Sequence, residues 1–159
     1  MVQITLLTVG TLKEAFWLDA MAEYRKRLSA YAKFEEITLK EERIADEDDQ
    51  TQIKSALERE GEKILAALPK DAYKIALCVE GKEMNSETLA QKIGEAADRT
   101  GKIALVIGSS HGLAPAVKEA CDLRLSVSQL TFPHQLMRVM LLEILYRSFS
   151  MLAGKRYHK

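Results

Sequence analysis

The chain has 159 residues, 47% of them hydrophobic and 29% charged, which fits one globular domain with its own core. Its 23 basic and 23 acidic residues balance, which argues against a protein that grips nucleic acid through a broad basic face. No apolar run approaches the ~20 residues that span a bilayer, and the first ten residues lack the basic start of a signal peptide. These features predict a cytoplasmic protein with no membrane partner.

The hydrophobic pattern alternates between strand and helix along the chain. From Leu12 to Ala32, apolar and aromatic residues recur every three or four positions, which predicts a helix with one buried face. The charged stretch 40–50 is expected to be a solvated, mobile loop. Strands are expected at 3–9, 34–39, 73–79, 103–107 and 123–127, and helices at about 12–32, 51–68, 86–97, 115–120 and 133–153.

This alternation predicts a single α/β domain with an open, mainly parallel sheet and helices on both faces. Ligands on such sheets bind outside the carboxyl ends of the strands, which here marks 77–81, 108–112 and 126–132. The G-x-x-x-G spacing of Gly108 and Gly112 is neither a dinucleotide fingerprint nor a P-loop, and an ordinary strand-to-helix turn explains it equally well. Cys78 and Cys121 lie among apolar neighbours without CxxC spacing, which favours reduced thiols over a disulfide or a metal site.

The segment 125–132, LSVSQLTF, alternates hydroxyl and apolar residues before Pro133. Thr131 is expected to cap the last helix, with Pro133 in its first turn. A second interpretation is a loop whose backbone groups bind the edge of an adenine. The spacing alone does not decide between the two.

The last helix is apolar around most of its circumference, which predicts burial and, at this place in the chain, a C2 homodimer interface. Glu143 and Arg147 are four apart and should form an ion pair. His134, Gln135 and Arg138 share the start of the helix, where the dipole suits a phosphate or carboxylate. Pairing with carboxylates within the fold is an equally good interpretation of these three.

The chain ends in Gly-Lys-Arg-Tyr-His-Lys, its strongest basic cluster. Lysine and arginine bind phosphates, and Tyr157 and His158 are side chains that stack on bases. The ordinary alternative is a frayed terminus without a role.

Four segments together resemble the RlmH family (also called YbeA or OrfX): ITLLTVGTLKEAFW, VIGSSHG, LSVSQLTFPHQLMRVMLLEILYRSF and GKRYHK. Two positions differ from the family's usual pattern, Ile144 in place of glutamine and Arg156 in place of a small residue or proline. The resemblance implies one SPOUT-class methyltransferase domain over 1–159, with a C-terminal trefoil knot within about 73–159. It also implies S-adenosyl-L-methionine (SAM) as methyl donor and an obligate homodimer.

The family's target is N3 of a pseudouridine, position 1915 of 23S rRNA in hairpin helix 69, on the assembled 70S ribosome. By position, the resemblance implies that SAM contacts Leu77, Gly108, Val127, Ser128, Gln129, Leu130, Thr131 and Phe132. It places His134, Arg138, Lys155, Arg156, Tyr157, His158 and Lys159 on the RNA side. No metal is implied.

Three residues carry the expected chemistry, because the imide N3 must lose its proton before it becomes a good nucleophile. His158, with a reference pKa of ~6.5, is the expected base, Arg138 the stabiliser of the anion, and Tyr157 a stacking or hydrogen-bonding partner. Two other classes stay open at this point: a non-catalytic ribosome-binding factor and another nucleotide-binding α/β enzyme.

Overall fold

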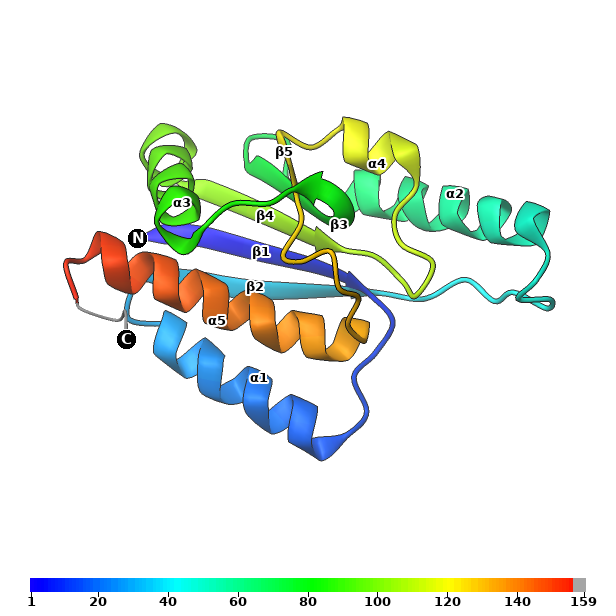
Figure 1. Ribbon diagram of the computed structural model, residues 1–159, viewed down its shortest axis with the longest axis horizontal. Helices are drawn as coiled ribbons and strands as arrows, with labels where there is room; N and C mark the ends of the chain where they lie inside the picture. Colours follow the sequence, from blue (N-terminus) through cyan, green and yellow to red (C-terminus); the bar gives the residue numbers. More distant parts are fainter. Residues whose placement is uncertain (156–159) are drawn as a thin grey trace.

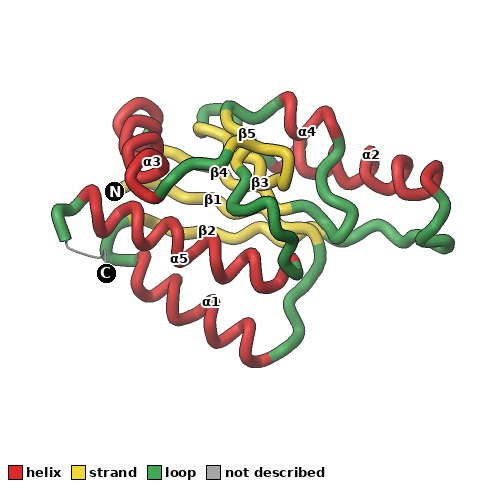
Figure 2. The backbone as a smooth tube through the Cα atoms, viewed as in Figure 1, coloured by secondary structure: helices red, strands yellow, loops and turns green. Residues whose placement is uncertain are grey.

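Strands and helices alternate through the whole of the computed structural model, which describes residues 1–155 (Figures 1 and 2). The predicted order of ten elements is confirmed, with most bounds within a few residues of the expected ones. The elements are β1 Val2–Val9, α1 Ala15–Leu28, β2 Ala32–Leu39, α2 Gln50–Ala67, β3 Tyr73–Lys82, α3 Ser86–Thr100, β4 Lys102–Ile107, α4 Pro115–Glu119, β5 Leu123–Leu125 and α5 His134–Leu152.

The five strands form one sheet in the order β2-β1-β4-β3-β5, and every neighbouring pair is parallel. Parallel pairing brings all carboxyl ends to one edge of the sheet. The register aligns these ends closely, because Val9 pairs with Leu39 and Thr8 pairs with Ile107. The segments that follow β1, β2 and β4 therefore begin side by side.

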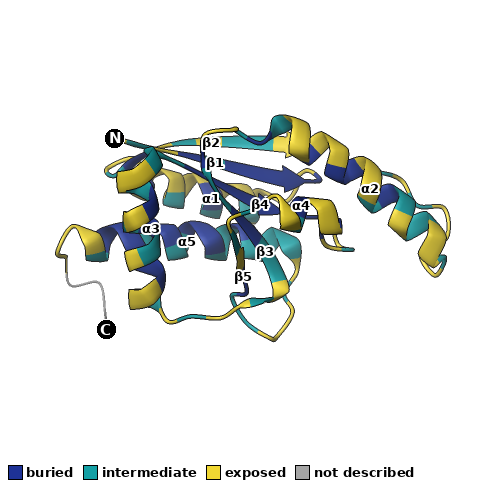
Figure 3. Ribbon diagram, turned by 90° about the horizontal axis from the view of Figure 1, so that it is seen from above, coloured by how far each residue is buried: buried dark blue, intermediate teal, exposed yellow. Residues whose placement is uncertain are grey.

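Helices cover both faces of the sheet, as predicted: α1, α3 and α5 lie on one face, and α2 and α4 on the other (Figures 1 and 3). Because both faces are covered, side chains on both sides of strand β4 are buried. Ile103 and Leu105 belong to the core beneath α1, α3 and α5, whereas Ala104 and Val106 belong to the core beneath α2 and α4. A continuous apolar strand is what a doubly covered position requires. The trefoil knot implied for 73–159 stays a prediction.

Two helix starts differ in how they are capped. The Asn85 side chain accepts a hydrogen bond from the Thr88 backbone N–H at 2.8 Å and caps α3. The predicted Thr131 cap of α5 is wrong. Pro133 occupies the N-cap position and no side chain caps this helix, because α5 begins at His134 and Thr131 lies two residues too early.

Strand β3 is longer than predicted. The strand was expected to end at 79, but β3 continues to Lys82, which pairs with Leu125 after a register shift. Gly81 permits this close approach, since a Cβ there would lie 2.8 Å from the carbonyl oxygen of Arg124. The end of β3 therefore curls over β5 and forms a wall at the carboxyl edge.

The charged segment 40–49 is a loop, as predicted, but it is tethered to α2. The Glu42 backbone N–H donates to Glu60 at 2.9 Å, and those of Ala45 and Asp46 donate to Gln52 at 3.1 Å each. Asp49 then caps α2. These bonds give the loop a defined course past the carboxyl edge, in contrast to the mobile loop expected from its composition.

Candidate functional site

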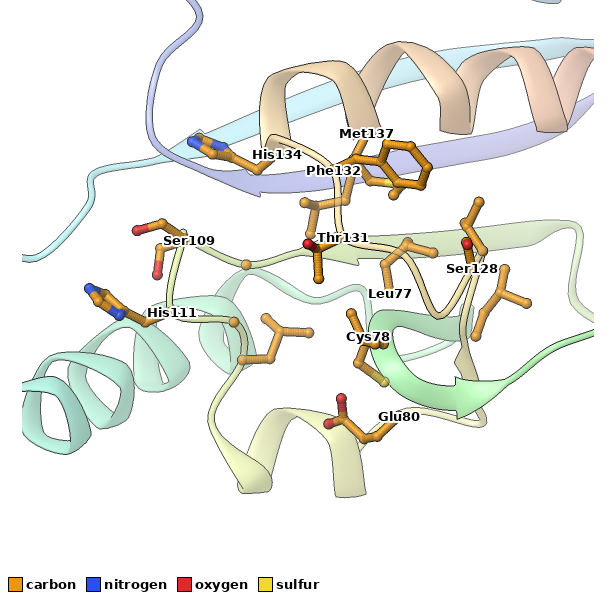
Figure 4. A pocket seen from close by; sticks show the side chains of 18 of the residues that line it. Leu77, Cys78, Glu80, Ser109, His111, Ser128, Thr131, Phe132, His134 and Met137 are labelled. Atoms are coloured by element: carbon orange, nitrogen blue, oxygen red, sulfur yellow. The ribbon is translucent and has the colours of Figure 1, made fainter. Parts of the chain in front are cut away.

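A cleft of about 370 Å³ lies at the carboxyl edge, bounded by the ends of β3 and β4 and by the loop between β5 and α5 (Figure 4). Its volume falls within the range of ~300–1,000 Å³ typical of small-molecule sites. All three strand-end segments marked in the sequence contribute to it. Of the residues expected to contact the cofactor, it is lined by Leu77, Gly108, Val127, Ser128, Leu130, Thr131 and Phe132.

Gln129 is the exception among those residues. Its side chain is exposed and it does not belong to the lining of the cleft.

The turn after β4 depends on Gly108. A Cβ at this position would lie 2.1 Å from the carbonyl oxygen of Gly112, a contact that the backbone cannot accommodate. The Gly112 N–H donates to the Ser109 carbonyl at 2.9 Å and closes the turn. The two glycines thus bend the chain back sharply and leave the end of β4 open to the cleft.

The loop from Ser126 to Thr131 is shaped by its own hydroxyl groups. Ser126 Oγ donates to the Ser128 carbonyl at 3.1 Å, and Ser128 Oγ accepts from the Leu130 N–H at 3.0 Å. Such local bonds hold a tight turn without a helix or strand. They leave Leu130 72% exposed at the rim of the cleft.

The opposite wall combines Cys78 and Glu80, from the segment 77–81 marked in the sequence, with Lys118, which the sequence did not single out. Lys118 of α4 forms an ion pair with Glu80, and this hydrogen bond holds the pKa of the Glu80 carboxyl below its usual value. Burial raises the pKa of the Cys78 thiol, so Cys78 contributes a neutral side chain to the lining. Both Cys78 and Cys121 are free thiols, and burial raises the pKa of Cys121 to about 11.

A buried carboxylate supports the turn from behind. Glu60 of α2 is 4% exposed and accepts from Ser109 Oγ at 3.0 Å as well as from the Glu42 N–H. Nearby, His111 Nε2 lies 2.8 Å from a carboxylate oxygen of Glu47. The sequence did carry a signal for Glu60, because it lies four residues after Ala56 and four before Ile64 on the buried face of α2.

Arg138 lies inside the fold and not in the cleft. Its side chain is 1% exposed and donates to the carbonyls of Val9 at 3.1 Å and Gly10 at 2.6 Å, with Glu36 at 3.8 Å. This placement matches the interpretation in which the arginine pairs within the fold. The expectation that Arg138 faces RNA or stabilises an anion in the site is not met, because burial keeps the guanidinium from both.

His134 is the first residue of α5 and lines the rim of the cleft. Burial, and then the positive charge of Arg138, lower the pKa of the imidazole, so the neutral ring predominates at pH 7. Its Nδ1 is buried and has no hydrogen-bond partner among residues 1–155. The ring points away from Leu77 (Figure 4).

The start of the basic tail lies far from the cleft. Lys155 follows α5 at the opposite end of the helix, where its Nζ lies 5.3 Å from the ring centroid of Tyr31. A hydrogen bond with Tyr31 raises the pKa of Lys155. The other predicted tail residues, Arg156, Tyr157, His158 and Lys159, lie outside the described residues.

Within residues 1–155, no cluster of three or more His, Cys, Asp or Glu side chains is placed to hold a metal ion. None of the helices in this part of the chain is both long enough and apolar enough to cross a membrane.

Comparison with known proteins gives matches over almost the whole chain. A family model described as predicted SPOUT methyltransferase matches residues 2–158. The ribosomal RNA large subunit methyltransferase H of Bifidobacterium adolescentis is 46% identical over 161 residues, covering 99% of each chain. The Streptococcus thermophilus protein of the same name is 43% identical over 158 residues, again with 99% of each chain covered.

A solved structure of the Legionella pneumophila protein Lpg2936 with its bound cofactor SAM has a related fold. The TM-score is 0.51 at 14% sequence identity, and the match covers 91% of this chain and 65% of that one. At this identity the likeness concerns the fold alone.

Proposed function

The chain belongs to the SPOUT methyltransferase family, and we propose that it methylates N3 of a pseudouridine in 23S rRNA, at position 1915 in the assembled 70S ribosome. SAM-dependent methylation of ribosomal RNA follows from the family and from full-length relatives of that name at 43–46% identity. The nucleotide, the atom and the ribosomal context are the proposal. It includes a cytoplasmic location, where assembled ribosomes are found.

One observation of the structure carries the proposal: three separate strand ends converge on a single cleft of small-molecule size. Leu77, Ile107 and Met137 offer apolar surface for an adenine ring and a thioether chain. The loop 127–132 offers backbone N–H and carbonyl groups for the polar edge of a base. When bound, SAM supplies the methyl group that the acceptor nitrogen takes.

The residues of the chain must position the acceptor and receive the N3 proton. We assign the proton to His158 and the stacking contact to Tyr157, in line with the resemblance. The expected role of Arg138 is not retained, because its guanidinium is buried against the carbonyls of Val9 and Gly10.

We propose that the tail acts on the cleft of a second subunit. Helix α5 has 19 residues, about 28 Å at ~1.5 Å per residue, and the cleft lies at its first turn. His158 follows Gly154 by four residues, which span at most about 14 Å when extended. This reach, shorter than the length of α5, supports a tail that acts on the cleft of a second subunit.

A homodimer supplies the second subunit, and α5 offers a face for it. Five half-buried residues recur every three or four positions along the helix, and the Glu143–Arg147 ion pair (2.7 Å) lies among them. Such a face with apolar residues around one ion pair is typical of a subunit interface. The five are Leu136, Met140, Glu143, Arg147 and Met151.

Mapping of the rRNA tests the reaction. Mass spectrometry of 23S rRNA from a strain without this protein should show an unmethylated pseudouridine at position 1915, and the purified protein with SAM should restore the methyl group on 70S ribosomes. An unchanged methylation pattern in the deletion strain would favour a non-catalytic ribosome-binding role. Calorimetry tests the other alternative, a different nucleotide-binding enzyme. The protein should bind SAM and should not bind NAD or ATP.

Mixing two variants tests the shared site, at a SAM concentration too low to fill the cleft of Gly108→Ala. A Gly108→Ala subunit keeps its tail, and a subunit lacking 157–159 keeps its cleft. Heterodimers should recover about a quarter of the wild-type activity of the mixture, because half the subunits pair heterologously and each such pair holds one complete site. Absence of recovery in mixtures verified to contain heterodimers would show that the tail serves its own chain.

A further inference from the structure

A second cleft, of about 530 Å³, lies at the same edge of the sheet beside the first. It is formed where β1 and β2 end. The register of these strands sets its floor, because Val9 pairs with Leu39 and the Gly10 N–H donates to the Leu39 carbonyl at 2.9 Å. The donor cleft therefore occupies the β4-β3-β5 half of the edge, and the second cleft occupies the β1-β2 half.

His134 is the residue common to both linings. Its Cε1 lies 3.8 Å from where a Cβ on Gly10 would be, so the ring fills the space between the end of β1 and the start of α5. In Figure 4 the ring lies at the margin of the first cleft and points out of it. His134 thus lies where the two clefts meet.

The second cleft carries charged groups of both signs that the fold leaves unused. Lys13, Glu14, Lys40 and Glu41 line it, and none of the four forms an ion pair within 4.0 Å in the described part of the chain. Other acidic residues near this edge are paired, such as Glu42 with Lys63 and Glu80 with Lys118. In the free protein these four groups are exposed to water. They lose that hydration only when a partner binds, and the partner's own charges can then compensate the cost of desolvation.

The presence of both lysines and carboxylates limits which kinds of ligand the second cleft can bind. The two ammonium groups suit phosphates, whereas the two carboxylates disfavour a small free anion. Thr38 and Gln135 add a hydroxyl and an amide, which can both donate and accept. Phosphates flanking a base with donor and acceptor edges, and a ribose 2′-OH, match this set, and that combination belongs to a nucleotide within an RNA strand.

We propose that the β1-β2 cleft holds the acceptor nucleotide of the RNA and its flanking phosphates, with the base reaching past His134 so that its N3 meets the methyl group of the donor. This inference rests on the proposed function, since it takes the first cleft as the donor site. It also fits a neutral protein that acts on RNA, because the cleft adds two lysines at one edge to the cations of the basic tail, with carboxylates beside them for base recognition.

Photo-crosslinking tests where the RNA lies. Positions 33 and 40 are exposed lysines at the two ends of β2, and only Lys40 lines the second cleft. With p-benzoylphenylalanine at position 40, irradiation on 70S ribosomes should give a crosslink at or next to the methylated nucleotide, found as a reverse-transcription stop. The same group at position 33 should give none there. Equal crosslinking from both positions, or none from position 40 on ribosomes that bind the protein, would overturn the proposal.

Lysine removal gives a second, independent measurement. Each of Lys13→Ala and Lys40→Ala should lower the salt dependence of RNA binding by a slope of about 1 and raise KM for ribosomes, with SAM affinity unchanged. Lys33→Ala is the matched control and should change neither. If SAM binds and rRNA is methylated but Lys13→Ala and Lys40→Ala behave like Lys33→Ala, this inference fails alone. If SAM does not bind the wild-type protein, the proposed function fails first.

Discussion

The two ends of α5 differ in how completely their polar groups are satisfied. At its start, no side chain caps the helix, and two clefts open beside the first turn. Within residues 1–155, three buried side-chain polar atoms lack a hydrogen bond, and all lie near this end: Thr8 Oγ1, His134 Nδ1 and Arg138 Nε.

The far end of α5 is closed by ordinary packing. Gly154 turns the chain with a φ of +72°, and its N–H donates to the Met151 carbonyl at 2.9 Å. Phe149 stacks on Tyr31, with 6.3 Å between ring centroids, and Lys155 lies over the same ring. Buried polar groups without a hydrogen bond reduce stability. Their concentration at the start of α5 indicates that the carboxyl edge serves ligand binding, whereas the end of α5 serves the stability of the fold.

Arg138, at the start of α5, should be the residue most sensitive to substitution. Arg138→Met should destabilise the protein by about 3 kcal/mol, because it leaves two buried carbonyls without their charged donor, whereas Glu36 keeps its ion pair with Arg25. Urea unfolding measures the change, with exposed Arg43→Met as the control, expected within ~0.5 kcal/mol of wild type. A variant of wild-type stability that binds ribosomes but does not methylate them would restore Arg138 to the reaction and refute its structural role.

Glycine substitutions at the two ends of β4 should differ in their effect on SAM binding. Gly108→Ala forces a Cβ against the Gly112 carbonyl and should lower the free energy of unfolding by about 1–3 kcal/mol. It should also weaken SAM binding ~10- to 100-fold. Gly101→Ala meets only the penalty of its φ of +66°, about 1 kcal/mol, since no atom lies within 4 Å of the added carbon.

Calorimetry with SAM distinguishes the two glycine variants. Gly101→Ala should bind SAM with wild-type affinity despite a melting temperature lower by ~2–4 °C. Equal loss of SAM affinity in both variants would mean that the turn after β4 has no special role.

Glu60 tests whether the donor cleft depends on the tethered loop behind it. Glu60→Gln retains the shape but leaves only one acceptor oxygen, so if that oxygen keeps the bond from the Glu42 N–H, the Ser109 hydroxyl must turn and accept from the amide nitrogen. We expect a loss of about 1–2 kcal/mol and a several-fold weaker affinity for SAM. Exposed Glu58→Gln on the same helix is the control. If both variants bind SAM as wild type does, Glu60 serves the fold but not the cleft.

The sequence predicted the fold well because its signals were local and strong. The uninterrupted apolar residues of 103–107 required cover on both faces, and the alternation of periods required parallel pairing. It predicted three segments of the donor cleft for a similar reason, since all parallel strands end at one edge.

What the sequence left unpredicted depends on distant partners. Glu60 meets Ser109 across 49 positions, and Arg138 meets Gly10 across 128, so no spacing rule relates them. The extension of β3 to Lys82 depends on Gly81 passing over the backbone of Arg124, a contact between segments that no local propensity encodes. The β1-β2 cleft was missed because its lysines and carboxylates look, in sequence, like ordinary surface charge.

The smallest expected effect concerns pH at His134, where the two clefts meet. Burial and the charge of Arg138 lower the pKa of His134 in the folded protein, against the opposing effect of Glu41, whereas the unfolded chain titrates near ~6.5. Below that pH the unfolded chain binds a proton that the folded protein excludes, so this group makes stability fall as pH drops from about 7 toward 5. His134→Gln lacks the group and should show a flatter dependence.

Urea midpoints at pH 7, 6 and 5 measure this dependence for both proteins. The stability of the wild type relative to His134→Gln should decrease with each step down in pH, whatever its value at pH 7. Parallel curves would mean that His134 protonates as freely in the folded protein as in the unfolded chain. The ring would then be hydrated, and water would join the two clefts at this point, so donor and acceptor would have to exclude it when they bind.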